Sequence, residues 1–173
     1  MTPHFVVAPL TTEHALSITT WRYAGKWSVY DSRPEEGPYE AEEGYAAVLD
    51  GDTLAGFLCV GAEARVPGLT EEPGVVDLGV GMNPALVGQG HGRRFGTAVL
   101  DHLRATGTDR VRIVVQSWNT RSLRLAARIG FTETGRHHAD VEYVVLHADL
   151  RSGEGGDGLH RAVELVRGDE VVR

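Results

Sequence analysis

The chain has 173 residues, with 17 basic and 24 acidic side chains and a formal net charge of −7. This length predicts a single domain with a sizeable core, and the negative charge excludes a general nucleic-acid-binding protein or a basic membrane-surface protein. Cys59 is the single cysteine, so no disulfide can form within the chain. No apolar run reaches the roughly 18 residues of a membrane span, and residues 1–20 lack the order of a secretory signal. We therefore expect a cytoplasmic protein.

The N-terminal part predicts two short regular elements and then an irregular segment. A strand is expected over 5–10 and a helix over 12–23. Residues 24–44 mix glycine, proline, aromatic and acidic residues, which is typical of an irregular helix-loop segment that lines a pocket. An Asp-Gly turn between two apolar runs then predicts a β-hairpin over 44–61.

The strand expected over 75–82 alternates between two faces. Valine, leucine and methionine side chains occupy one face, whereas Asp77, Gly79 and Gly81 share the other with Asn83. We expect this glycine-containing face to let a ligand approach the backbone closely.

The run over 80–95 is the most informative stretch of the sequence. A strand-like segment leads into Gly88, Gly90 and Gly92, which open a helix expected over 91–106. Glycines let consecutive backbone N–H groups converge on one anion, and the helix N-terminus favours negative charge at the same place. The pattern lacks the Lys-Ser/Thr pair of a Walker loop and the spacing of a dinucleotide-binding loop. It therefore predicts a pyrophosphate-binding loop of another kind.

The C-terminal part predicts a strand, a helix and two further strands. The strand is expected over 111–115, and Asn119 caps a helix that ends at Gly130. The last two strands are expected over 131–134 and 141–146. This order of elements predicts an α/β fold in which helices flank a mixed sheet.

The domain is expected to cover residues 1–150. Residues 151–173 begin with a glycine-rich stretch, which predicts a flexible linker and a short C-terminal extension.

Two segments together resemble the GNAT superfamily of acyl-CoA-dependent N-acyltransferases. Val-Gly-Gln-Gly-His-Gly at 87–92 is similar to the family's Q/R-x-x-G-x-G/A loop, and Asn-Thr-Arg-Ser at 119–122 with Gly-Phe at 130–131 resembles its second motif. The pattern is most similar to the branch that acetylates protein N-termini and related amines. The resemblance implies a mostly antiparallel sheet of six to seven strands, with acetyl-CoA as cosubstrate.

The resemblance also implies which residues hold acetyl-CoA. Strand backbone would pair with the pantetheine arm, loop amides would bind the pyrophosphate, and an N–H near Val80 or Met82 would stabilise the oxyanion that forms at the thioester. The implied binding residues are Val80, Met82, Val87, Gly88, Gln89, Gly90, His91, Gly92, Arg93, Asn119, Ser122 and Arg128.

Two positions depart from the family pattern. Val87 replaces the usual Gln or Arg, but binding should survive because the backbone makes most loop contacts. Ala126 replaces a Tyr that protonates the leaving thiolate in many members, so the acid must come from elsewhere. Ser122 is the candidate acid and Asp77 the candidate general base. The alternatives are a capping or surface serine and a surface or turn-bonding aspartate.

Aromatic residues are expected to form the wall of the acceptor site. They are Trp21, Tyr23, Trp27 and Tyr30, and the acidic segment 35–43 would attract a cationic amine. The alternatives are core anchors for the aromatic rings, ordinary surface charge for the acidic residues, or a homodimer contact. The adjacent His137 and His138 have no partner ligands at suitable spacing, so we expect no metal site.

The leading interpretation is an N-acetyltransferase that acts on a primary amine by direct attack in a ternary complex. The amine would belong to a protein N-terminus or a small molecule. The alternative is a non-catalytic acyl-CoA-binding regulatory module that kept the loop and lost the chemistry.

Overall fold

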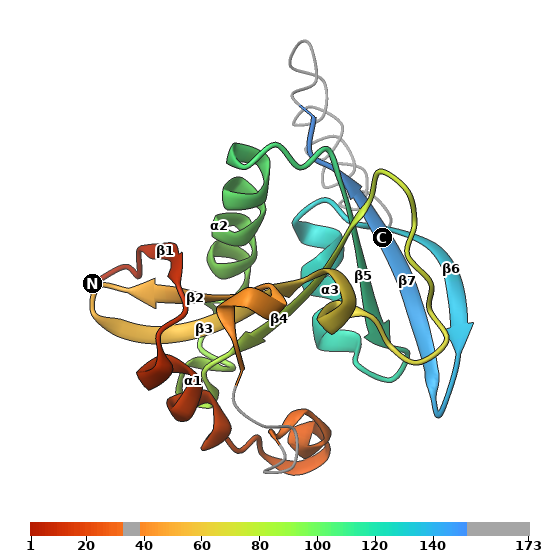
Figure 1. The fold of residues 1–173 in the computed structure, drawn as a ribbon. Coiled ribbons are helices and arrows are strands. Elements are labelled where there is room, and N and C mark those ends of the chain that lie inside the picture. The colour runs from red at the N-terminus through yellow and green to blue at the C-terminus, as the bar shows by residue number, and fades with distance from the viewer. Residues whose placement is uncertain (33–38, 152–173) are drawn as a thin grey trace, which may run out of the picture.

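A computed structural model describes residues 1–32 and 39–151 of the chain. Seven strands form a single sheet in the order β1-β2-β3-β4-β5-β7-β6 (Figure 1). The strands are β1 (Phe5–Pro9), β2 (Tyr45–Asp50), β3 (Thr53–Val60), β4 (Val76–Met82), β5 (Arg110–Gln116), β6 (Thr132–His138) and β7 (Glu142–Asp149). Every neighbouring pair is antiparallel except β4 and β5, which run parallel. The predicted mixed, mostly antiparallel α/β sheet is confirmed.

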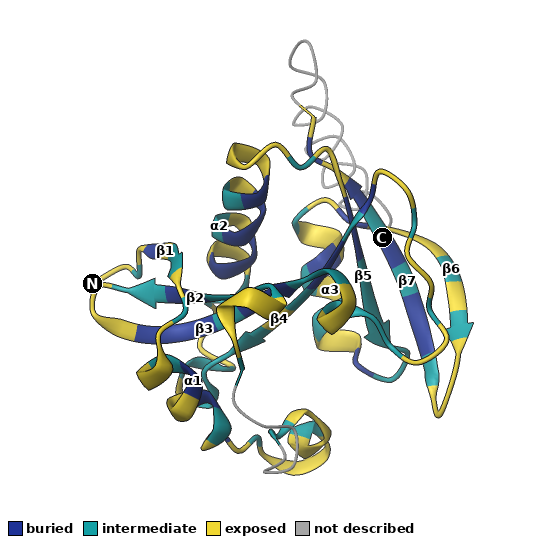
Figure 2. Ribbon diagram, viewed as in Figure 1, coloured by how far each residue is buried: buried dark blue, intermediate teal, exposed yellow. Residues whose placement is uncertain are grey.

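Helices cover both faces of the sheet. The α-helices are α1 (Thr12–Thr19), α2 (Gly92–Ala105) and α3 (Thr120–Arg128), and the 3-10 helices are η1 (Gly25–Tyr30), η3 (Ala41–Glu43), η4 (Gly61–Ala64) and η5 (Pro84–Leu86). The buried side of α2 packs on the main core, which contains Phe95 and Val99 (Figure 2). A second cluster joins Ile18 and Trp21 to the opposite face of β2 and β3.

The first helix is shorter than its pattern predicts. It ends at Thr19 rather than at residue 23. The hydroxyls of Thr19 and Thr20 donate to the carbonyls of Leu16 and Ser17 within the last turn. Such local bonds compete with continuation of the helix.

The glycine-containing face of β4 is filled by protein side chains. A Cβ on Gly81 would lie 2.3 Å from the Phe57 ring, and one on Gly79 would lie 2.8 Å from Cys59 Sγ. The expectation that this face admits a ligand is therefore wrong, because these glycines make room for the side chains of β3.

Strands β4 and β5 are joined along only part of their length. Their register contains the pairs Val76–Val111 and Asp77–Arg112. Both strands then continue, to Met82 and Gln116 respectively, and diverge as they do so (Figure 1). The result is an opening in the sheet between residues 78–82 and 113–116.

Candidate active site

The opening between β4 and β5 is lined by backbone groups of β4. In an antiparallel pair, every second residue turns its N–H and C=O toward the partner strand. Asn83 N–H donates to Ala55 O at 2.8 Å, so Asn83 and Gly81 face β3. Val80 and Met82 therefore direct their N–H and C=O groups to the other side, into the opening. These are the two residues for which the family resemblance implies thioester and pantetheine binding.

The loop after β4 is shaped by a side-chain cap and two glycines. Asn83 Oδ1 accepts from Ala85 N–H at 3.0 Å, and Asn83 Nδ2 donates to Leu54 O at 3.0 Å. Gly88 and Gly90 then adopt left-handed φ angles of 79° and 81°. Such angles are costly for residues with a Cβ, so the turn that leads into α2 depends on glycine.

The third glycine of this loop has a packing role. Gly92 is the first residue of α2, and a Cβ there would lie 3.0 Å from Leu125 Cδ2 of α3. Gly92 therefore lets the start of α2 approach α3. Gln89, His91 and Arg93 lie in the same segment, which follows β4 and η5 and runs into the first turn of α2.

The N-terminus of α3 is fixed by Asn119. This residue is only 4% exposed. Its Oδ1 accepts from Ser122 N–H at 3.2 Å, which caps the helix, and its Nδ2 donates to the Tyr30 hydroxyl at 3.0 Å. Arg128 lies in the last turn of α3, at the opposite end of the helix from Asn119, and its contact with a phosphate of the cosubstrate stays a prediction.

Asp77 lies at the point where β4 and β5 separate. It is 3% exposed, and its Oδ1 accepts from Arg112 Nε at 2.6 Å while its Oδ2 accepts from Arg65 Nη1 at 3.0 Å. Arg112 also contacts Glu72, whose carboxylate is bonded to His147. Two guanidinium groups thus compensate the charge of Asp77. The contacts describe an ion-pair clamp, and neither oxygen is free of a partner.

The predicted acceptor residues fall into two groups. Trp21 is 7% exposed and packs in the core beside Phe57. By contrast, the Tyr23 hydroxyl reaches the end of β4, where it donates to Met82 O at 2.7 Å. The acidic segment predicted to attract the amine lies partly outside the described residues, so that role and the homodimer contact stay predictions.

Trp27 and Tyr30 form an aromatic cluster with Trp118, which the sequence analysis did not select. The Tyr30 ring stacks on Trp118 with a centroid distance of 6.2 Å, and the Trp27 ring lies 6.1 Å from Trp118. The guanidinium of Arg121 lies 4.3 Å from the centre of the Trp27 ring. Trp118 directly precedes the capping Asn119, and this position in the sequence could have identified it as a site residue.

Burial changes the acidity of two groups near these elements. The pKa of Tyr23 is raised to about 12, mainly by burial and further by the nearby Tyr39 and Asp31. Burial likewise raises the pKa of the Cys59 thiol to about 11. Cys59 is therefore a neutral core residue at physiological pH, as expected for a structural cysteine.

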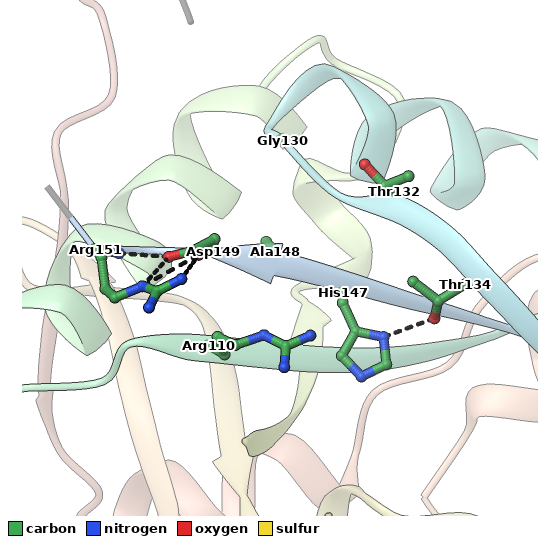
Figure 3. A pocket seen from close by; sticks show the side chains of 8 residues that line it. All are labelled: Arg110, Gly130, Thr132, Thr134, His147, Ala148, Asp149 and Arg151. Carbon is green, nitrogen blue, oxygen red and sulfur yellow. Dashed lines mark hydrogen bonds and ion pairs between the residues drawn. The ribbon is translucent and has the colours of Figure 1, made fainter. Parts of the chain in front are cut away.

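A separate shallow pocket of about 640 Å³ lies elsewhere on the sheet (Figure 3). Its lining includes Arg110, Thr134 and His147. Arg110 begins β5, whereas the opening toward β4 lies at the other end of that strand. This pocket is therefore distinct from the candidate active site.

The described part of the chain, residues 1–32 and 39–151, has two further properties. In this part of the chain, no helix has the length and apolar character needed to cross a membrane. The same residues contain no group of three or more His, Cys, Asp or Glu side chains placed to hold a metal ion.

Several curated proteins are similar in sequence to this chain. The mycothiol acetyltransferase of Thermobispora bispora is 34% identical over 120 residues, which cover 69% of this chain and 39% of that protein. That of Rhodococcus erythropolis is 35% identical over 115 residues, covering 65% of this chain and 37% of that protein. The chain thus spans about two fifths of the length of these relatives.

Solved structures and a family comparison agree on the fold. AAC(6')-Ib in complex with ribostamycin and coenzyme A superposes with a TM-score of 0.70 at 16% identity, covering 89% of this chain and 99% of that chain. A GNAT-family acetyltransferase from Bacillus anthracis gives a TM-score of 0.63 at 13% identity, covering 88% and 98%. Residues 13–131 match the family described as Acetyltransferase (GNAT) family. With the opened sheet and the glycine loop at its edge, this match shows that the chain belongs to the GNAT family of acetyltransferases.

Proposed function

We propose that the protein transfers the acetyl group of acetyl-CoA to the primary amine of a small molecule, by direct attack in a ternary complex in the cytoplasm. The observation that carries the proposal is the row of β4 backbone groups facing the opening, next to the glycine loop. A small-molecule acceptor is favoured over a protein N-terminus because the sequence relatives are named mycothiol acetyltransferases and one structural neighbour binds ribostamycin.

The chain's own groups suit the parts of acetyl-CoA. The pantetheine arm would lie between β4 and β5 and pair with the backbone of Val80 and Met82, as an added strand does. Loop amides between Gly88 and Arg93, with the positive end of α2, would hold the pyrophosphate. An N–H of β4 would polarise the thioester carbonyl and stabilise the oxyanion during attack.

Asp77 and Ser122 have different roles in the proposed reaction. Because both oxygens of Asp77 bond to arginines, we propose that it clamps the two strands, and that the acceptor enters as its free amine or loses its proton to water. Ser122 stays a candidate for the proton donor, since it lies in the first turn of α3. No step requires Cys59, which is buried and neutral.

The test combines turnover with binding. Purified protein is mixed with acetyl-CoA and a panel of amino sugars, polyamines and N-terminal peptides, and release of free thiol is followed while calorimetry measures acetyl-CoA binding. Turnover that is fastest with a small-molecule amine supports the proposal. Binding without turnover on every acceptor would favour the regulatory module, and absence of binding would overturn the proposed site.

A matched pair of glycine variants ties binding to the loop. Gly90 and Gly107 both have left-handed φ angles, 81° and 89°, and a Cβ would meet no atom within 4 Å at either position. Gly90→Ala and Gly107→Ala should therefore carry similar backbone strain, of about 1 kcal/mol. We expect only Gly90→Ala to weaken acetyl-CoA binding.

A further inference from the structure

The position at which the family resemblance implies a proton-donating tyrosine holds Ala126 here. Ala126 lies in α3, is 4% exposed and belongs to the main core cluster. A methyl group in the core cannot protonate a thiolate. If the protein transfers an acetyl group as proposed, another residue near the opening must do so or the thiolate must leave unprotonated.

The Tyr23 hydroxyl lies at the edge of the opening. It donates to Met82 O at 2.7 Å, across a sequence separation of 59 residues. The alternation of β4 directs this carbonyl away from β3 and into the opening. The phenol therefore contacts the same stretch of backbone that would pair with the pantetheine arm.

The position of Tyr23 is fixed from both sides along the chain. Two residues earlier, Trp21 is buried in the second core cluster with Ile18. Tyr23 N–H itself donates to Asp31 Oδ1 at 2.7 Å. This bond links the residues on either side of η1. The buried Trp21 side chain and the Tyr23 N–H bond to Asp31 hold the donor in place, which pre-organises it for a proton transfer.

Tyr23 starts the reaction protonated, and its raised pKa makes it a weaker acid than an ordinary phenol, so the transfer depends on the negative charge that develops on sulfur as the C–S bond breaks. Burial, followed by the nearby Tyr39 and Asp31, raises its pKa to about 12, so the phenol keeps its proton throughout the physiological range. The tyrosinate left after transfer is correspondingly basic and recovers a proton readily. Ser122, the other candidate, has an aliphatic hydroxyl, which is a far weaker acid than a phenol.

We propose that the Tyr23 hydroxyl is the proton donor to the leaving thiolate, an assignment that rests on the proposed acetyl transfer. The amine nitrogen forms a bond to the acetyl carbon, and the C–S bond breaks with its electron pair on sulfur. The Tyr23 O–H proton passes to sulfur and gives the free thiol. The proton lost by the attacking nitrogen returns to the Tyr23 oxygen, so the enzyme regains its starting state.

The first experiment compares Tyr23→Phe, Ser122→Ala and Tyr45→Phe with the unchanged protein. Tyr45 is the control because it is also a partly buried tyrosine with a raised pKa, and its hydroxyl bonds to Glu63 rather than to β4. We expect Tyr23→Phe to lower kcat by about 100-fold or more, with little change in acetyl-CoA binding by calorimetry. Tyr45→Phe should stay within a few fold of the unchanged protein.

A second readout needs no turnover. In the complex with CoA, the pKa of the bound thiol is titrated by thiolate absorbance. A phenol that donates to sulfur stabilises the thiolate, so Tyr23→Phe should raise that pKa. Replacement of Tyr23 by a fluorotyrosine of lower pKa should move the alkaline fall in kcat to lower pH. A merely structural tyrosine would shift neither quantity.

The outcomes separate the two proposals. Failure of the unchanged protein to acetylate any amine counts against the proposed function. An active protein whose Tyr23→Phe variant keeps normal kcat and an unshifted thiol pKa overturns the assignment of Tyr23. Loss of kcat in Ser122→Ala alone would assign the proton to Ser122. If Tyr23→Phe unfolds, the fluorotyrosine protein, which retains the hydroxyl, decides through its pH profile.

Discussion

The two halves of the β4–β5 pair differ in what holds them. In the joined half, the buried carboxylate of Asp77 bonds to Arg112 of β5 and to Arg65 of the preceding loop. In the open half, Val80 and Met82 present backbone groups with no strand opposite them. Charged side chains thus join β4 and β5 up to Asp77. Beyond that point the two strands no longer pair with each other, and Met82 O accepts from the Tyr23 hydroxyl instead.

This difference shows which part of the molecule offsets the free-energy cost of the backbone groups that face the opening. Backbone groups without partners are unfavourable unless water or a ligand bonds to them. The open half gains nothing from pairing between β4 and β5, so the joined half, the flanking helices and the outer neighbours β3 and β7 must hold the two strands in place. We therefore expect variants of the joined half to affect stability and variants of the open half to affect chemistry.

The largest effect is expected from Asp77→Ala. It leaves Arg112 buried without its closest anionic partner, so the free energy of unfolding should fall by about 3–5 kcal/mol. Urea unfolding measures the loss. Asp101→Ala serves as control because its pair with Arg104 is solvent-exposed, and pairs of this kind contribute about 1 kcal/mol or less. Similar losses in both variants would contradict the clamp.

In the open half, Val80→Pro should lower kcat strongly and the free energy of unfolding only slightly. Proline removes the N–H that faces the opening, whereas the hydrogen bonds from Gly81 to β3 are kept. Loss of one oxyanion donor lowers kcat by about 100- to 1000-fold. Val80→Ala keeps the N–H, and the side chain is 53% exposed, so that control should be nearly normal. Normal kcat in Val80→Pro would place the donor elsewhere.

Gly81→Ala tests the assignment of the glycine face to packing. Because an added Cβ would lie 2.3 Å from the Phe57 ring, we expect a loss of about 1–3 kcal/mol in thermal or urea unfolding. A second substitution, Phe57→Leu, should recover part of the loss by removing the clash. Gly135→Ala is the control, since a Cβ there meets no atom within 4 Å. Equal stability of the two alanine variants would show that the face is not tightly packed.

The smallest effect is expected from Glu72→Gln, at the margin of the clamp. The hydrogen bond from His147, with the nearby Arg112, lowers the pKa of Glu72. Because the pKa of Glu72 is lower in the folded state, its ionised carboxylate stabilises the fold at pH values above its unfolded-state pKa of about 4.3. This stabilisation is lost as the pH falls through the folded-state pKa. The contribution should be about 1 kcal/mol or less, because the side chain is 35% exposed. Unfolding measured against pH should show the two proteins converging below about pH 4. If the free energies of unfolding of the two proteins keep a constant difference at every pH, the ionisation of Glu72 does not contribute to stability.

Local features of the sequence predicted much of the fold. The Asp-Gly turn, the glycine loop before α2 and the cap at Asn119 each depend on residues a few positions apart, and all lie in the expected elements. The apolar pattern predicts too late an end for the first helix, because the pattern does not include the hydroxyls of Thr19 and Thr20 as competing donors.

The candidate site was harder to predict because its contacts are distant in sequence. Asp77 looked like a free carboxylate, yet its partners Arg65 and Arg112 come from two separate segments. The sequence predicts an open face at Gly79 and Gly81, whereas in the structure the side chains of Cys59 and Phe57 cover these glycines. Sequence patterns give the direction of a side chain but not its neighbour across the sheet.

By itself, the sequence determined the order of the elements, the glycine turn and the resemblance to an acetyltransferase family, because these depend on local dihedral angles and short spacings. Only the tertiary structure decided that β4 and β5 separate after Asp77, that this aspartate is held by two arginines, and that Tyr23 reaches Met82. Such contacts depend on strand register and long-range packing, which no local pattern fixes.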